Sequence, residues 1–158
     1  MNRRLPALAI LLGVLGLIVF IVCGLGAVTV RWQASAPQLL AALTSFGAVI
    51  LGFLGGVHWG FALGDEAGRG ERPRLILGVV PALIGWVAVL VALVAPVEVT
   101  LAVLIVGFIA AALLDTSLRR QGFVPSGYLG LRWGLTIAVV ALLATVLVLR
   151  LIGAHIVL

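Results

Sequence analysis

The sequence predicts an all-α membrane protein, a bundle of five transmembrane helices with the N-terminus cytoplasmic and the C-terminus outside. Of its 158 residues, 64% are hydrophobic and only 9% are charged, a balance that no soluble domain requires. The apolar residues form runs of about 20, the length that crosses a hydrocarbon layer of about 30 Å. Because lipid cannot satisfy free backbone groups, and because the runs lack the alternation of barrel strands, they must be helices. We expect one domain, 1–158, with spans at about 5–30, 39–64, 75–95, 97–114 and 133–152.

The distribution of arginine predicts the orientation. All ten basic residues are arginines that lie near the ends of the spans, and only Arg31 and Arg150 fall on one side. The other side carries Arg3, Arg4, Arg69, Arg72, Arg74, Arg119, Arg120 and Arg132. By the positive-inside rule this side is cytoplasmic, which suits a multi-pass protein of the bacterial inner (plasma) membrane. The formal charge of +5 then reflects topology, and we expect no nucleic-acid partner.

The first span, 5–30, holds glycines among aliphatic residues and nothing that could do chemistry, which favours an anchor. A rival interpretation is a signal peptide cleaved after the sequence Ala34-Ser35-Ala36. The apolar run is longer than the core of about 7–15 residues typical of signal peptides, and Pro37 follows the site, so we expect the span to be retained.

The second span carries a stripe of glycines, called the glycine stripe below, at Gly52, Gly56, Gly60 and Gly64. Small residues four apart expose a shallow groove that lets another helix backbone approach closely. We therefore predict that the glycine stripe packs against a neighbouring helix. His58 lies about 200° around the helix from Gly56 and faces the other way. Because a polar ring facing lipid is costly, we expect neighbours on both faces and a central position for this helix.

A polar cluster is predicted around His58. Asp115 ends the fourth span and Arg132 begins the fifth, so both lie in the same leaflet as His58. We expect the imidazole to hydrogen-bond to Asp115, Arg132 or Tyr128. An intramembrane ionisable group suggests a functional site, although a histidine bonded only to a backbone carbonyl or water is the alternative.

The third span contains Pro81, which removes one backbone hydrogen bond and predicts a kink. Together with Gly85 and Trp86 it suggests a pocket for a lipid or quinone, with ordinary packing as the alternative. The third and fourth spans are joined so tightly that they must form an antiparallel hairpin. Glu98 suits the start of the fourth helix, where a negative charge is favourable.

Several kinds of chemistry are disfavoured. The sequence offers no phosphate-binding glycine loop, no metal-ligand cluster and, with Cys23 as its single cysteine, no intrachain disulfide. Ser45 and His58 are 13 residues apart on one helix, too far for a catalytic pair. A haem held by two histidines is excluded within one chain because His58 and His155 lie near opposite surfaces. We expect no enzymatic activity, no metal and no cofactor.

Four motifs resemble a small bacterial and mitochondrial inner-membrane family of unknown function that includes human transmembrane protein 69. They are FLGGVHWG at 53–60, PALIGW at 81–86, GFIAAALLD at 107–115 and VPSGYLGLRWGLT at 124–136. The resemblance covers about 39–136 and implies a multi-pass inner-membrane protein. It implies no activity and assigns no site residues.

Two functions are compatible with these features. The first is a non-catalytic accessory, assembly or stabilising subunit that packs against other integral membrane subunits and lipids through the glycine stripe. The alternative is a small transporter, or a protein that handles protons or quinones, using His58 and Asp115. With five spans such a transporter would have to dimerise.

Overall fold

A computed structural model describes residues 7–29, 34–64, 71–120 and 126–153. These residues form five long helices, α1 (Ala7–Val28), α2 (Ala36–Leu63), α3 (Glu71–Val94), α4 (Val97–Arg120) and α5 (Ser126–Leu151). Each is long and apolar enough to cross a membrane, and none carries more than two charged residues within its most apolar stretch. The all-α fold with five spans is thereby confirmed.

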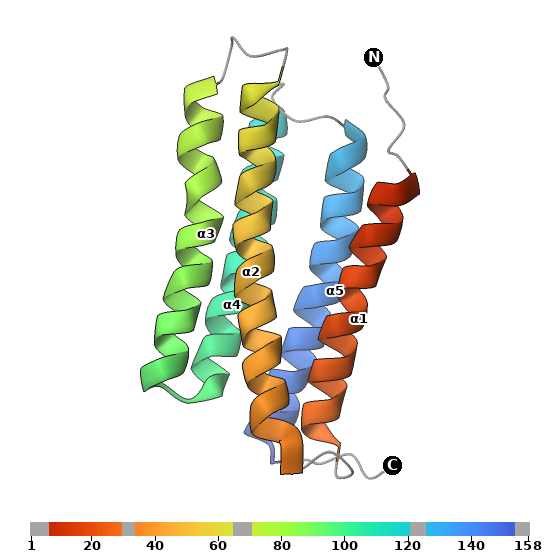
Figure 1. The fold of residues 1–158 in the computed structure, drawn as a ribbon, viewed down its shortest axis with the longest axis vertical. Helices are drawn as coiled ribbons and strands as arrows, with labels where there is room; N and C mark the ends of the chain where they lie inside the picture. The colour runs from red at the N-terminus through yellow and green to blue at the C-terminus, as the bar shows by residue number, and fades with distance from the viewer. Residues whose placement is uncertain (1–6, 30–33, 65–70, 121–125, 154–158) are drawn as a thin grey trace.

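The helices run alternately up and down in a closed bundle (Figure 1). Each packs against the next in the chain, α5 returns to α1, and α2 also contacts α4 across the bundle. α2 therefore has three neighbours, as does α4, which agrees with the central position predicted for α2. The expectation of neighbours on both of its faces is wrong among the described residues, because Gly56 and Gly60 are exposed. The starts of α1, α3 and α5 and the ends of α2 and α4 lie together at one end of the bundle (Figure 1). We call this the α1-start end, and it holds Arg72 and Arg120 while Arg150 lies at the opposite end.

Two helix boundaries differ from those expected by six residues or more. α4 continues six residues past the predicted end, to Arg120, and α5 begins at Ser126 instead of 133. The expected limits followed the apolar runs, whereas a helix keeps its backbone hydrogen bonds into the polar headgroup region. Arg119 and Arg120 in the last turn of α4 also interact favourably with the negative end of the helix dipole. As a result, Tyr128 and Arg132 lie on the first two turns of α5.

The backbones of α2 and α3 approach each other closely, but at glycines outside the predicted glycine stripe. Gly55 lies so near the Gly78 carbonyl that a Cβ on Gly55 would overlap it. A Cβ on Gly85 would come 2.6 Å from the carbonyl oxygen of Ala48.

Among the described residues, the predicted packing of the glycine stripe against a neighbouring helix is therefore wrong. A Cβ at Gly52, Gly56 or Gly60 would meet nothing within 4 Å, and at Gly64 it would approach only the Gly60 carbonyl of its own helix. The spacing of four is typical of a packing face, but the face that contacts α3 lies one residue away, at Gly55. Periodicity alone does not reveal which of two adjacent glycines faces the neighbour.

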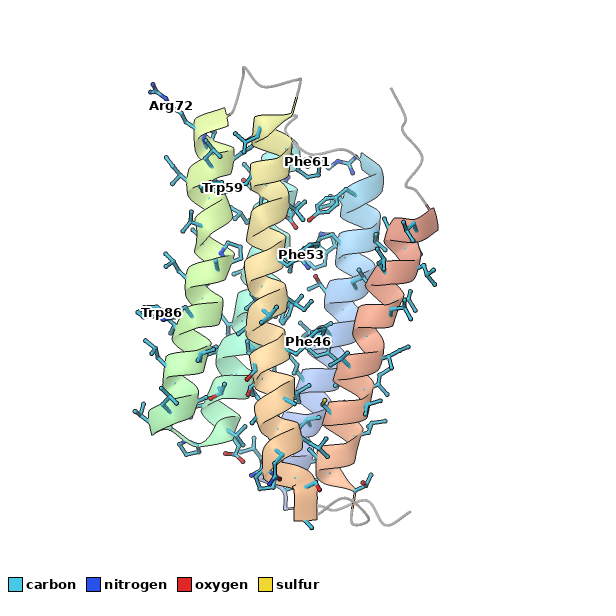
Figure 2. The ribbon with its side chains drawn as sticks, in the orientation of Figure 1. Phe46, Phe53, Trp59, Phe61, Arg72 and Trp86 are labelled. Carbon is cyan, nitrogen blue, oxygen red and sulfur yellow. The ribbon has the colours of Figure 1, made fainter. Side chains whose placement is uncertain are left out.

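The centre of the bundle is apolar. Leu43, Leu51, Leu101, Leu104 and Leu143 are fully buried between the helices. The outer surface is also apolar, because many large aliphatic side chains point away from the bundle. Trp86, 60% exposed on α3, is one of the large apolar side chains on this surface (Figure 2). An apolar exterior is what a helix bundle needs when its solvent is lipid.

Candidate functional site: a polar cluster beside an apolar slot

His58 and Asp115 meet in the interior. The imidazole Nε2 lies 2.6 Å from Oδ1 of Asp115, and both side chains are 2% exposed. Because a carboxylate only accepts hydrogen bonds, a hydrogen bond across this contact requires the imidazole proton to be on Nε2. Nδ1 of His58 is buried and has no hydrogen-bond partner among the described residues. α2 and α4 are thus joined by a short polar contact at a position where lipid would not tolerate an isolated charge.

Arg132 completes the cluster from α5. Its Nε donates to Oδ2 of Asp115 at 2.7 Å, and its Nη1 donates to Oγ1 of Thr136 at 2.7 Å, one turn along the same helix. Asp115 therefore uses one oxygen for α2 and the other for α5. We call His58, Asp115, Arg132 and Thr136 the polar cluster.

The charges of the polar cluster balance when the imidazole is neutral. The Asp115 carboxylate and the Arg132 guanidinium then form a pair of zero net charge, both nearly inaccessible. Pairing is the condition under which charges persist in an apolar interior, because each unpaired ion costs several kcal/mol there. The cluster consequently fixes the relative positions of α2, α4 and α5.

An apolar slot adjoins the polar cluster. It has a volume of about 580 Å³ and is lined by α1, α2 and α5 with Phe108 of α4. It exists because the backbones of α2 and α5 stay apart in the described part of the chain. Figure 2 shows Phe46, Phe53 and Phe61 pointing from α2 toward the space in front of α5.

Pairs of aromatic rings lie near both ends of the slot. Toward the middle of the bundle, Phe20 contacts Phe46 and Phe108 edge to face, with ring centroids 5.2 and 6.1 Å apart. Near the α1-start end, Phe61 and Tyr128 make the same kind of contact at 5.5 Å. On each of the three main helices the lining extends over 12 residues, which are 11 helical steps, for example from Tyr128 to Val139 on α5. At 1.5 Å per residue the slot is about 16 Å long, about half the thickness of a hydrocarbon core.

The α5 wall of the slot carries three polar residues among apolar ones. Tyr128, Arg132 and Thr136 lie on successive turns of α5 and line it, and the rest of the lining is almost entirely aliphatic and aromatic. The polar cluster therefore reaches the slot through Arg132 and Thr136, while His58 and Asp115 lie behind them. Among the predicted site residues, the structure brings His58, Asp115 and Arg132 into direct contact and places Tyr128 one turn from Arg132.

The pocket predicted around Pro81, Gly85 and Trp86 does not coincide with the slot, because none of these three residues lines it. Pro81 and Gly85 are buried, and Gly85 rests against the backbone of α2, which leaves no room for a ligand. Trp86 points outward from the bundle (Figure 2). The proline lies within α3, which continues as one helix from Glu71 to Val94.

Other polar contacts were not foreseen. Arg150 donates from Nε to Oε1 of Glu98 at 2.7 Å, joining the end of α5 to the start of α4. Arg150 also lines a second cavity, of about 500 Å³. Trp133 Nε1 donates to Oγ1 of Thr116 at 3.0 Å. The available signal for the first contact was a pair of opposite charges at helix ends, Glu98 beginning one span and Arg150 ending another.

His155 lies outside the described residues. Cys23 is a buried free thiol on α1.

Comparison with known proteins gives a family but no chemistry. Residues 5–148 match a family described as "Protein of unknown function (DUF3429)". A stretch of 86 residues, 54% of this chain, is 37% identical to Transmembrane protein 69 of Xenopus tropicalis, of which it covers 33%. The chain thus spans about a third of the length of that relative. No solved structure matches the chain.

Proposed function

The chain belongs to the DUF3429 family of proteins of unknown function, and from its own geometry we propose that this multi-pass membrane protein binds a lipid-like amphiphile in the α1–α2–α5 slot. The observation that carries the proposal is an apolar cavity, about as long as one leaflet, with Tyr128, Arg132 and Thr136 on one wall. Its 580 Å³ fall within the range of about 300–1,000 Å³ typical of ligand sites.

Access to the slot is from the lipid. Phe53 lines the slot and is nevertheless 66% exposed, so the slot opens on the outer surface of the bundle. α1 and α2 lie close together where Gly26 meets Leu39, and their axes separate toward the α1-start end (Figure 1). An amphiphile already in the membrane can enter there without crossing water. Its tail then exchanges contacts with neighbouring lipid for contacts with the apolar lining of the slot.

The test fills the slot without disturbing the bundle. Gly16 lines the slot, and a Cβ there would meet nothing within 4 Å, so Gly16→Leu adds side-chain volume inside the cavity. In nanodiscs, an amphiphile with a diazirine in its tail is expected to label the slot peptides of the natural protein and to label Gly16→Leu severalfold less. Peptide mapping by mass spectrometry measures the yield.

The matched control is Gly134→Leu. Gly134 is an exposed helical glycine of α5 that also has open space around it but does not line the slot. This variant should keep natural labelling and a natural unfolding temperature. Equal labelling of both variants, or no labelling of slot peptides in the natural protein, would refute the proposed function.

A second candidate is the non-catalytic accessory or assembly subunit, and the unoccupied glycine stripe supports it. Gly56 and Gly60 are exposed and have no neighbour among the described residues, whereas the opposite face of the same helix packs against other helices of the bundle. Such a face allows close approach of a helix from another integral membrane subunit. The arginine distribution supports a location in the bacterial plasma membrane with the N-terminus cytoplasmic.

The second candidate predicts a loss of assembly without a loss of folding. Gly60→Leu should leave the unfolding temperature of the purified chain unchanged while abolishing co-purification of partner subunits in gentle detergent. Gly134→Leu serves as the control here too. A natural protein that purifies alone from its own membrane would contradict this role.

A further inference from the structure

Two buried polar groups on the slot wall lack partners. The Tyr128 hydroxyl and Nη2 of Arg132 are inaccessible to water and make no hydrogen bond among the described residues. Arg132 as a whole is 4% exposed. A buried donor without a partner costs about 1–3 kcal/mol, so such groups in a native interior call for an explanation. Both residues line the slot, but these two atoms are covered, so the side chains of Tyr128 and Arg132 have to turn toward the slot to meet a molecule bound there.

The two groups determine the hydrogen-bonding chemistry of the head group that can bind them. A guanidinium has only donors, and a phenol hydroxyl can donate, so the complementary group is an acceptor. Thr136 does not supply one, because its Oγ1 already accepts from Nη1 of Arg132. A cationic head such as an ammonium would lie beside the guanidinium of Arg132 and be repelled by its like charge.

With the imidazole of His58 neutral, the charge balance of the polar cluster favours a neutral acceptor. The charge of Arg132 is already matched by Asp115, which holds the Nε side of the guanidinium at 2.7 Å. A carboxylate head would add an uncompensated negative charge next to Asp115 in an apolar interior, at a marked energetic cost. A carbonyl oxygen accepts from both donors and adds no charge.

The position of these groups along the slot sets the direction of the tail. Tyr128 lies near the α1-start end, and the rings of Phe20 and Phe46 lie near the other end of the slot, about 16 Å away. A head bound at Tyr128 and Arg132 therefore points its tail toward the middle of the bundle. The rest of the lining, with leucine, valine and phenylalanine side chains, suits one hydrocarbon chain.

We propose that the slot recognises a single-chain amphiphile with a neutral carbonyl head, whose oxygen accepts hydrogen bonds from the Tyr128 hydroxyl and Arg132 Nη2. This inference rests on the proposed function and adds the ligand class and the orientation. The Asp115 carboxylate and Thr136 hold the guanidinium in place for this contact.

The experiment compares three photoreactive probes in nanodiscs, identical in a tail that carries a diazirine near its end and different in the head. The heads are a methyl ketone, a carboxylate and a trimethylammonium. We expect the ketone to give the highest yield, the ammonium the lowest, and the label to fall on peptides containing Phe20 or Phe46. A label confined to peptides near Ala9 or Val57 would contradict the proposed orientation.

Tyr128→Phe isolates the head-group contact. It removes a hydroxyl that has no partner among the described residues, so the bundle should unfold at the natural temperature or slightly above it. Labelling by the ketone should fall about fivefold, the weight of one hydrogen bond to a neutral acceptor, while ammonium labelling stays unchanged. Thr145→Val is the control, since it removes an exposed hydroxyl of α5 outside the slot and should change neither yield.

The possible failures are distinguishable. Equal slot labelling by all three probes, a carboxylate that exceeds the ketone, or an unaffected Tyr128→Phe would overturn the head-group inference and leave the slot as a site for apolar tails. Absence of slot labelling with every probe would refute the proposed function as well.

Discussion

Asp115→Ala is expected to destabilise the bundle by about 3 kcal/mol or more, because it leaves two buried groups without their polar partner. Arg132 would remain 4% exposed with its charge unmatched, and His58 would lose the acceptor of its Nε2 proton. Three helices depend on the carboxylate, since its oxygens join α4 to α2 and to α5. Thermal unfolding in a mild detergent, followed by circular dichroism or by tryptophan fluorescence, measures the loss.

Two variants show whether the loss comes from the stranded charge. Asp115→Leu combined with Arg132→Met removes both ions, and should recover most of the stability because no unpaired charge is left in the interior. Glu98→Gln breaks an ion pair whose side chains are 32% and 25% exposed, and should cost less than about 1 kcal/mol. If Asp115→Ala unfolded like Glu98→Gln, the polar cluster would not be holding the helices together.

Gly55→Ala is expected to destabilise the protein by about 2 kcal/mol, whereas Gly56→Ala at the next position should be neutral or slightly stabilising. The Cβ added at Gly55 would overlap the Gly78 carbonyl, a backbone group that cannot rotate away, so α2 and α3 would have to separate. The Cβ added at Gly56 meets nothing within 4 Å, and alanine favours the helix over glycine. The same unfolding measurement compares the two variants.

The adjacent pair also tests the position of the contact face. Equal destabilisation by the two substitutions would show that the α2–α3 interface is not centred on Gly55. Gly85→Ala provides a second check on α3, because its Cβ would come 2.6 Å from the Ala48 carbonyl oxygen. It should behave like Gly55→Ala.

The candidate site divides into a part that the sequence predicted and a part that it did not. The depth of a residue in a membrane follows from its distance along the chain from a polar loop, so His58, Asp115 and Arg132 could be assigned to one leaflet in advance. Intramembrane charges must be paired, which made their meeting a reasonable expectation. The structure adds which atoms meet, with Asp115 between the other two.

The slot could not be predicted, because a cavity is a property of how helices are spaced rather than of any one helix. Its lining comes from residues of α1, α2 and α5 that are mostly ordinary aliphatics, indistinguishable in the sequence from those that fill the core. The pocket expected at Pro81, Gly85 and Trp86 followed from a local irregularity in one helix. In the structure Gly85 instead allows α3 to pack closely against the backbone of α2.

The sequence by itself determined the five membrane-crossing helices, because the length of an apolar run and the need to satisfy backbone hydrogen bonds in lipid are both local properties. Only the tertiary structure decided which face of α2 meets α3, and that the gap between α2 and α5 forms a slot with Tyr128 and Arg132 on its wall. Helix packing depends on rotations of about 100° per residue and on spacings of a few ångströms, to which hydropathy is insensitive. For this reason hydropathy does not distinguish Gly55, which contacts α3, from Gly56, which does not.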